Sequence, residues 1–116
     1  MGVYFACKPI ELGDIVKCSF DLNKTEFSIF IFFMDSDGSA FSVKDVADNL
    51  SFDRSTVQKA IKSLIDRDII RRSQSNLGSG GYLFTYSINS KEVIKKKILE
   101  NIDLWHNSIK KLISNW

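Results

Sequence analysis

The stretch that decides the fold is Phe52-Asp-Arg-Ser-Thr-Val-Gln-Lys-Ala-Ile-Lys-Ser-Leu-Ile-Asp-Arg-Asp-Ile-Ile-Arg-Arg-Ser-Gln74. Apolar residues stand at positions 57, 60, 61, 64 and 65, which is the spacing of one helical face. This pattern predicts a helix over 54–66, with Asp53 as an N-cap whose carboxylate accepts the first backbone N–H groups. The opposite face holds only cationic and hydrogen-bonding groups, namely Arg54, Ser55, Gln58, Lys59 and Lys62. Such a face suits a nucleic-acid groove.

Two helix starts precede this stretch. Asn23 and Glu26 have the spacing of a capping box, which predicts a helix over 24–34. Its β-branched and aromatic content would also allow a strand, but the capping box favours the helix. Because this helix is apolar on nearly every side, we expect it to be covered by the terminal segments or by a second subunit. Ser42 and Asp45 form a second cap, which begins another helix.

A β-hairpin is predicted after helix 54–66, with strands over 68–74 and 82–88. The intervening Asn-Leu-Gly-Ser-Gly-Gly sequence supplies a flexible turn. Four residues of the second strand alternate onto one face, which we expect to pack on the core. They are Tyr82, Phe84, Tyr86 and Ile88. With a very short strand at 40–41, these elements predict one α+β unit over residues 22–88.

The two ends of the chain are predicted to be helical. Residues 1–21 form an N-terminal helical extension, with a short helix over 9–19 and Pro9 in its first turn. Residues 89–116 form one long helix whose apolar residues step by three or four, the spacing of a helix–helix seam. Each large side chain left in water would forgo about 1.5–3 kcal/mol, so we expect a second copy to cover part of the stripe in a two-fold dimer. The stripe is Ile94, Ile98, Ile102, Trp105, Ile109, Leu112 and Trp116.

The composition is that of a globular domain, with 44% hydrophobic and 26% charged residues among 116. The longest apolar run, 29–34, is far shorter than the roughly 20 residues of a membrane span. No signal peptide is visible, so we expect a cytoplasmic location without membrane association. The net charge of +2 is unevenly distributed: residues 1–50 carry −4, residues 51–75 carry +3 and residues 76–116 carry +3. That asymmetry favours a polyanionic partner, although the C-terminal lysines also suit ordinary solvation of a helix.

No catalytic, metal or cofactor site is predicted. Cys7, Cys18 and His106 are too few for a four-ligand zinc site, and none has zinc-finger spacing. The two thiols are expected to be plain reduced side chains, with a redox-switching disulfide as the alternative. The glycine-rich turn precedes a strand and lacks the Lys-Ser/Thr of a phosphate-binding loop. We therefore expect no enzymatic activity and no cofactor.

Residues 22–88 resemble the winged helix-turn-helix transcription regulators of the MarR and archaeal TrmB-like kind. The resemblance is carried by Leu22-Asn-Lys-Thr-Glu26, Ser42-Val-Lys-Asp-Val-Ala-Asp-Asn-Leu50 and Arg54-Ser-Thr-Val-Gln-Lys-Ala-Ile-Lys-Ser-Leu-Ile65. It implies an α+β winged helix-turn-helix over 22–88, followed by a C-terminal dimerisation helix over 89–116. The wing differs from the MarR pattern, because Arg71-Arg72 precede a short glycine turn where Asp-x-Arg would precede a long tip.

The function expected from these features is that of a homodimeric, sequence-specific regulator of double-stranded DNA with a pseudo-palindromic operator. Helix 54–66 would enter the major groove and the wing over 69–86 would reach the backbone or minor groove. Arg54, Gln58 and Lys59 are the candidates for base edges. The candidates for phosphates are Ser42, Ser55, Thr56 and Lys62, with Arg71 and Arg72 reaching from the wing. Two alternatives remain: a winged-helix module that binds protein, and a domain that serves only dimerisation.

Overall fold

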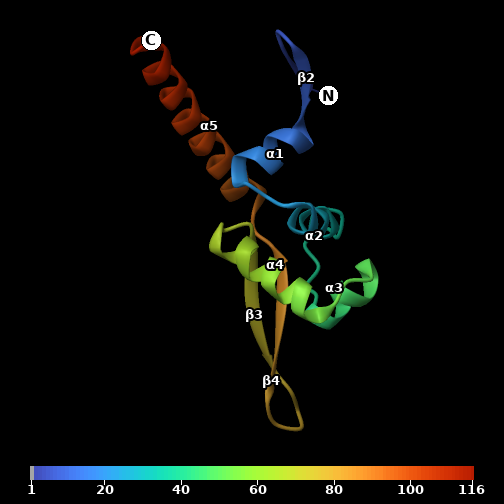
Figure 1. The fold of residues 1–116 in the computed structure, drawn as a ribbon. Coiled ribbons are helices and arrows are strands. Elements are labelled where there is room, and N and C mark those ends of the chain that lie inside the picture. Colours follow the sequence, from blue (N-terminus) through green and yellow to red (C-terminus); the bar gives the residue numbers. More distant parts are fainter. Residues whose placement is uncertain (1) are drawn as a thin grey trace. The chain divides into compact units, whose positions relative to one another are not determined.

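The structure is a computed structural model that describes residues 2–116 and divides into two compact units (Figure 1). The central unit comprises Asn23–Ser90. The terminal unit joins the chain up to Leu22 with Lys91–Trp116. The N-terminal extension and the C-terminal helix, expected as separate segments, thus belong to one unit. Within residues 2–116 no helix is long and apolar enough to cross a membrane.

The central unit has the element order of a winged helix-turn-helix. Its elements are α2 (Lys24–Met34), α3 (Val43–Leu50), α4 (Arg54–Asp66), β3 (Ile70–Asn76) and β4 (Tyr82–Ile88). A single bridge pairs Phe41 with Tyr86, so a minimal third strand lies beside the hairpin. The α+β fold class is confirmed, and α4 has the predicted bounds.

The helix starts follow the predicted caps in two of three cases. The Asn23 side chain accepts from the Glu26 backbone N–H at 2.8 Å, and Glu26 Oε1 accepts from the Asn23 N–H at 2.8 Å. Ser42 and Asp45 make the same reciprocal pair at the start of α3. Asp53 has the extended backbone of an N-cap, but within the described chain its side chain makes no cap hydrogen bond, so the expected capping role of that carboxylate is wrong.

The turn between α3 and α4 depends on one left-handed residue. Ser51 has φ 58° and ψ 41°, and the N–H of Phe52 returns to the carbonyl of Ala47 at 3.1 Å. This conformation ends α3 and redirects the chain within three residues, as the turn of a helix-turn-helix requires. The position is strained for a residue with a Cβ, because the left-handed region favours glycine.

The core of the central unit lies between α2, α3, α4 and the start of β3. Its most deeply buried side chains are Ile29, Phe33, Val46, Val57, Ile61, Leu64, Ile69 and Ile70. The Phe32 and Phe41 rings lie 4.9 Å apart between centroids and continue this core. Within this chain Ile31 of α2 remains 40% exposed, so coverage of that side by a second subunit stays a prediction. One face of α2 is therefore buried and the face that bears Ile31 is exposed.

The hairpin begins two residues later than predicted. The N–H of Asp68 donates to the carbonyl of Ile65, and the N–H of Ile69 donates to the carbonyl of Leu64. Asp68 and Ile69 therefore close the end of α4, and β3 starts after them. Asp68 also has φ 60°, which breaks an extended strand. Tyr86 is buried as expected, but Tyr82 at the far end of the same face is 57% exposed. Only the base of the hairpin packs on the core.

The terminal unit begins with a hairpin that the sequence did not predict. Strand β1 (Gly2–Phe5) pairs antiparallel with β2 (Lys8–Glu11), and α1 (Leu12–Phe20) follows. The predicted helix over 9–19 therefore starts three residues too early. Pro9 lies in β2 opposite Tyr4, a position open to proline because both strands of a two-stranded ribbon are edges. Asp14 marks the true start, since its carboxylate accepts from the N–H of Glu11 at 3.2 Å.

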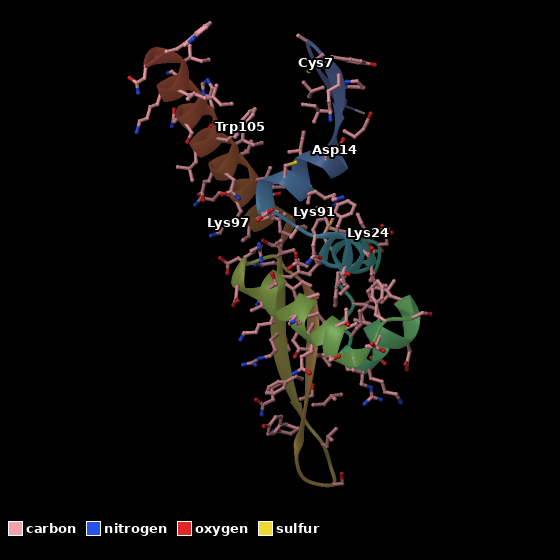
Figure 2. All side chains as sticks on the ribbon, in the orientation of Figure 1. Cys7, Asp14, Lys24, Lys91, Lys97 and Trp105 are labelled. Carbon is pink, nitrogen blue, oxygen red and sulfur yellow. The ribbon has the colours of Figure 1, made fainter. Side chains whose placement is uncertain are left out.

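Helix α5 (Lys91–Ser114) is two residues shorter at each end than the predicted 89–116, and α1 packs against it. The amide of Asn101 donates to the backbone carbonyl of Ser19 at 2.9 Å and ties the two helices together. The predicted apolar stripe divides along α5. Its first half is covered to differing extents, with Ile94 buried and Ile98 and Ile102 half-buried. In its second half Ile109 is half-buried, whereas Trp105, Leu112 and Trp116 are exposed, and Figure 2 shows Trp105 projecting from the helix.

Candidate nucleic-acid interface

Helix α4 separates its side chains sharply into a buried face and an exposed face. The buried face consists of Val57, Ala60, Ile61 and Leu64. All six of the predicted contact residues on this helix are exposed: Arg54, Ser55, Thr56, Gln58, Lys59 and Lys62. The structure therefore presents, from one rigid element, the cationic and hydrogen-bonding groups that the sequence selected.

These exposed residues do not lie on one line. At 3.6 residues per turn, Ser55, Lys59 and Lys62 lie near the middle of the exposed face. Arg54 and Gln58 flank it on one side and Thr56 on the other. One turn beyond Lys62 the same face carries the exposed acid Asp66. The cationic surface thus ends near the last turn of α4.

A hollow of about 550 Å³ lies between the start of α2 and the Thr56 side of α4. Its walls are Asn23, Thr25, Glu26, Ser55, Thr56, Lys59, Ala60 and Ser63. Thr25 and Ser63 were not predicted as site residues, because no spacing along the chain links two helices so far apart in sequence. Four hydroxyl groups, one lysine and the Glu26 carboxylate line this hollow beside the exposed face of α4.

Arg67 belongs to the basic stretch but has a structural role. Its Nη1 lies 3.9 Å from Oε2 of Glu26, and it donates to the backbone carbonyl of Ser63 at 3.2 Å and to the Ser63 hydroxyl. Glu26 is only 7% exposed. The pair joins the first turn of α2 to the end of α4.

Ser42 lies at the N-terminus of α3, where a phosphate contact was predicted. Its hydroxyl already accepts from the N–H of Asp45 at 3.2 Å, and the Asp45 carboxylate accepts from the N–H of Ser42 at 3.1 Å. A carboxylate therefore already interacts with the positive end of the helix dipole there. The Ser42 hydroxyl can still donate its O–H to a phosphate, as can the remaining backbone N–H groups of the first turn.

The two arginines of the wing lie on opposite faces of the hairpin. Arg72 is paired with Tyr86 and Arg71 with Ser87, and successive residues of a strand alternate sides. The guanidinium of Arg72 lies 4.5 Å from the centre of the Phe84 ring. The sequence grouped these residues together, but the structure gives them different surroundings.

Residues 2–116 contain no cluster of His, Cys, Asp and Glu that could hold a metal ion. Cys7 and Cys18 are both free and exposed, and Figure 2 shows Cys7 at the hairpin of the terminal unit.

Comparison with known proteins places this arrangement in a family. Residues 12–109 match the family described as DnaD N-terminal domain. The chain belongs to the DnaD N-terminal domain family. The match includes α1, the whole central unit and most of α5, so it spans both units. An uncharacterized protein of Methanocaldococcus jannaschii is 27% identical to this DnaD-type chain over 107 residues, which cover 92% of this chain and 80% of that protein.

Two solved structures are informative about this DnaD-type fold. One, described as a possible transcriptional regulator from Methanosarcina mazei, is 30% identical, with a TM-score of 0.88 over 100% of this chain and 97% of that chain. The second is a mutant of S. aureus MepR bound to an oligodeoxyribonucleotide, with 12% identity and a TM-score of 0.57 over 90% of this chain and 72% of that chain. At that identity the likeness concerns the fold alone, which is that of winged-helix regulators.

Proposed function

We propose that this chain is a homodimeric, sequence-specific DNA-binding transcriptional regulator, organised like the MarR and archaeal TrmB-like regulators. The observation that carries the proposal is the exposed face of α4, where Arg54, Lys59 and Lys62 stand among hydrogen-bonding side chains on a helix held by a buried core. A recognition helix of this fold lies in the major groove with such a face toward the bases.

The contacts follow from the chemistry of each side chain. Arg54 and Lys59 suit the acceptors of guanine, and Gln58 suits adenine. Ser55, Thr56 and Lys62 suit phosphates, together with the N-terminus of α3 at Ser42. Thr25 and Ser63 extend this surface, since the hollow between α2 and α4 brings them beside Lys59. From the wing, Arg71 reaches the backbone, whereas Arg72 is oriented by Phe84.

The dimer is supported by the outer half of α5. Trp105 is 57% exposed and Leu112 is 74% exposed, although both lie on the predicted seam. Large apolar side chains left in water forgo the favourable free energy of burial, and the same stripe on a second copy supplies a matching surface. Ile109 lies between them on the same stripe. Two copies joined in this way would present two recognition helices to a two-fold symmetric operator.

The test is titration of a fluorescent random-sequence duplex with the full chain at two salt concentrations. A DNA-binding chain releases counterions, so its affinity should fall steeply as salt rises, with a log–log slope of about −0.9 per phosphate contacted. Duplexes that the chain selects from a random pool should then contain a palindrome. Negligible affinity at the lower salt concentration would contradict the proposal and favour a protein-binding module.

A further inference from the structure

The far end of the wing is chemically unlike its base. Residues 73–90 contain no charged side chain, so Arg71 and Arg72 are the last cations before α5. The wing tip, defined as residues 76–83, instead exposes three apolar side chains. Leu77 is 47% exposed, Tyr82 57% and Leu83 43%. A tip without cations cannot neutralise phosphates, which is the usual contribution of a wing to affinity.

The apolar groups surround the tip and do not form one flat patch. In the hairpin register Tyr82 pairs with Asn76 and Leu83 with Ser75, so Tyr82 and Leu83 point to opposite faces. Leu77 lies at the crown. A surface that docks on a protein presents its apolar side chains on one face. A wedge that inserts between two stacked base pairs presents apolar side chains on both of its faces. The tip has the second arrangement.

Two backbone hydrogen bonds close the loop at the tip. The N–H of Leu77 donates to the carbonyl of Gly81 and the N–H of Gly80 to that of Leu77, both at 3.1 Å. Gly80 and Gly81 have φ of 89° and 86°, which favours glycine, and the described chain leaves the space beside Gly80 open. Below the tip, the Tyr82 and Phe84 rings lie 5.0 Å apart, and Arg72 covers the far side of this pair.

The hairpin carries this tip outward from the rest of the central unit. Figure 1 shows β3 and β4 extending beyond α3 and α4 to the loop at their end. The stack of Arg72, Phe84 and Tyr82 is continuous with the strand that also bears Arg71. Leu83 lies on the face of the hairpin that bears Arg71, whereas Tyr82 lies on the face that bears Arg72.

We propose that the wing tip is an apolar wedge that enters the minor groove and opens a base step of the same duplex that α4 reads. Apolar side chains inserted in this way partly unstack the step and bend the DNA. The cost of bending depends on the sequence, so the chain selects flexible pyrimidine–purine steps at positions where it makes no polar base contact. This inference rests on the proposed function, because it needs a DNA duplex bound by α4.

The experiment compares two fluorescent duplexes of equal length, one with TA steps spaced by a helical turn and the other with A-tracts. The wild-type chain should prefer the TA duplex by about five- to tenfold, because A-tracts are stiff and TA steps are easily kinked. The double variant Leu77→Ser/Leu83→Ser should lose this preference and retain the salt dependence. Thermal unfolding of the variant checks its fold, and the single variant Tyr82→Ala tests the other face independently.

One further measurement follows the base step itself. The base analogue 2-aminopurine at the TA step should brighten when the wild-type chain binds and stay dim with the double variant. Equal affinity for both duplexes together with unchanged 2-aminopurine fluorescence would overturn the wedge and leave DNA binding intact. Failure of the wild-type chain to bind either duplex at low salt would instead refute the proposed function. A double variant that keeps the full TA preference also overturns the wedge.

Discussion

The guanidinium carbon of Arg72 lies 4.5 Å from the centre of the Phe84 ring, on the opposite side of the hairpin from Arg71. Arg72 pairs with Tyr86 and Phe84 with Gln74, so the contact runs diagonally between the strands. One cation of an adjacent pair therefore interacts with an aromatic ring of the wing itself. Both arginines are exposed, but Arg71 lies on the opposite face and away from the Phe84 ring.

This difference predicts unlike effects of removing the two charges. Arg71→Ala should reduce the magnitude of the salt slope of DNA binding by about 1, because one phosphate contact is lost. Arg72→Ala should leave the slope nearly unchanged and lower the free energy of unfolding by about 0.5–1 kcal/mol, as for an exposed cation–π contact. Salt titrations and urea unfolding measure the two quantities. Equal changes in slope for both variants would contradict the distinction.

The exposed face of α4 predicts a second contrast. Arg54→Ala should cost about 1–3 kcal/mol of binding free energy and relax the preference at one base pair, because arginine reads a base edge. Lys62→Ala should weaken binding to all sequences alike, because a phosphate contact carries no sequence information. Affinities for a selected duplex and a random duplex provide the measurement. If both variants lose affinity equally on the two duplexes, the assignment of Arg54 to a base is wrong.

The Glu26–Arg67 pair predicts that two equivalent capping residues contribute different amounts to the free energy of unfolding. Glu26 in α2 and Asp45 in α3 occupy the same cap position, but Glu26 is buried beside Arg67 while Asp45 is exposed. Asp45→Ala should cost about 1 kcal/mol of unfolding free energy, the ordinary value of a cap. Glu26→Ala should cost about 3 kcal/mol, because it also removes the partner of a partly buried cation. Denaturant unfolding measures both, and equal losses would show that the ion pair adds nothing.

The left-handed turn between α3 and α4 predicts a stabilising substitution. Ser51→Gly should raise the free energy of unfolding by up to about 1 kcal/mol, since glycine adopts φ 58° without the strain of a Cβ. Ser51→Ala keeps the Cβ and serves as the control, with no gain expected. A thermal melt of the three chains distinguishes these outcomes. A destabilised Ser51→Gly chain would mean that the serine side chain, and not the backbone, maintains the turn.

The proposed dimer predicts that one exposed position on α5 is sensitive to charge. Leu112→Glu should convert the dimer to a monomer at micromolar concentration, because a carboxylate in an apolar seam is costly to desolvate. Asn107→Glu introduces the same side chain on the opposite side of the helix and should leave the dimer intact. Analytical ultracentrifugation distinguishes the two states. A wild-type chain that is monomeric under these conditions would remove the basis for the seam.

Local patterns predicted most of the central unit. The bounds of α4, the caps at Asn23 and Ser42, and strand β4 follow from spacing along a few neighbouring residues. The N-terminal hairpin was missed because two four-residue strands carry little periodicity, and Pro9 also suits the first turn of a helix. The prediction that the Asp53 side chain caps α4 was wrong, because the residue type shows only that the side chain could accept a hydrogen bond.

By itself, the sequence determined the winged-helix order and the cationic face of α4, because both depend on the period of one helix or strand. Only the tertiary structure decided what lies between elements. It placed Thr25 of α2 beside Lys59 of α4, paired Arg67 with Glu26, and separated Arg71 from Arg72. These relationships depend on the packing of distant segments and on the register of two strands, neither of which is set by the spacing of residues along one element.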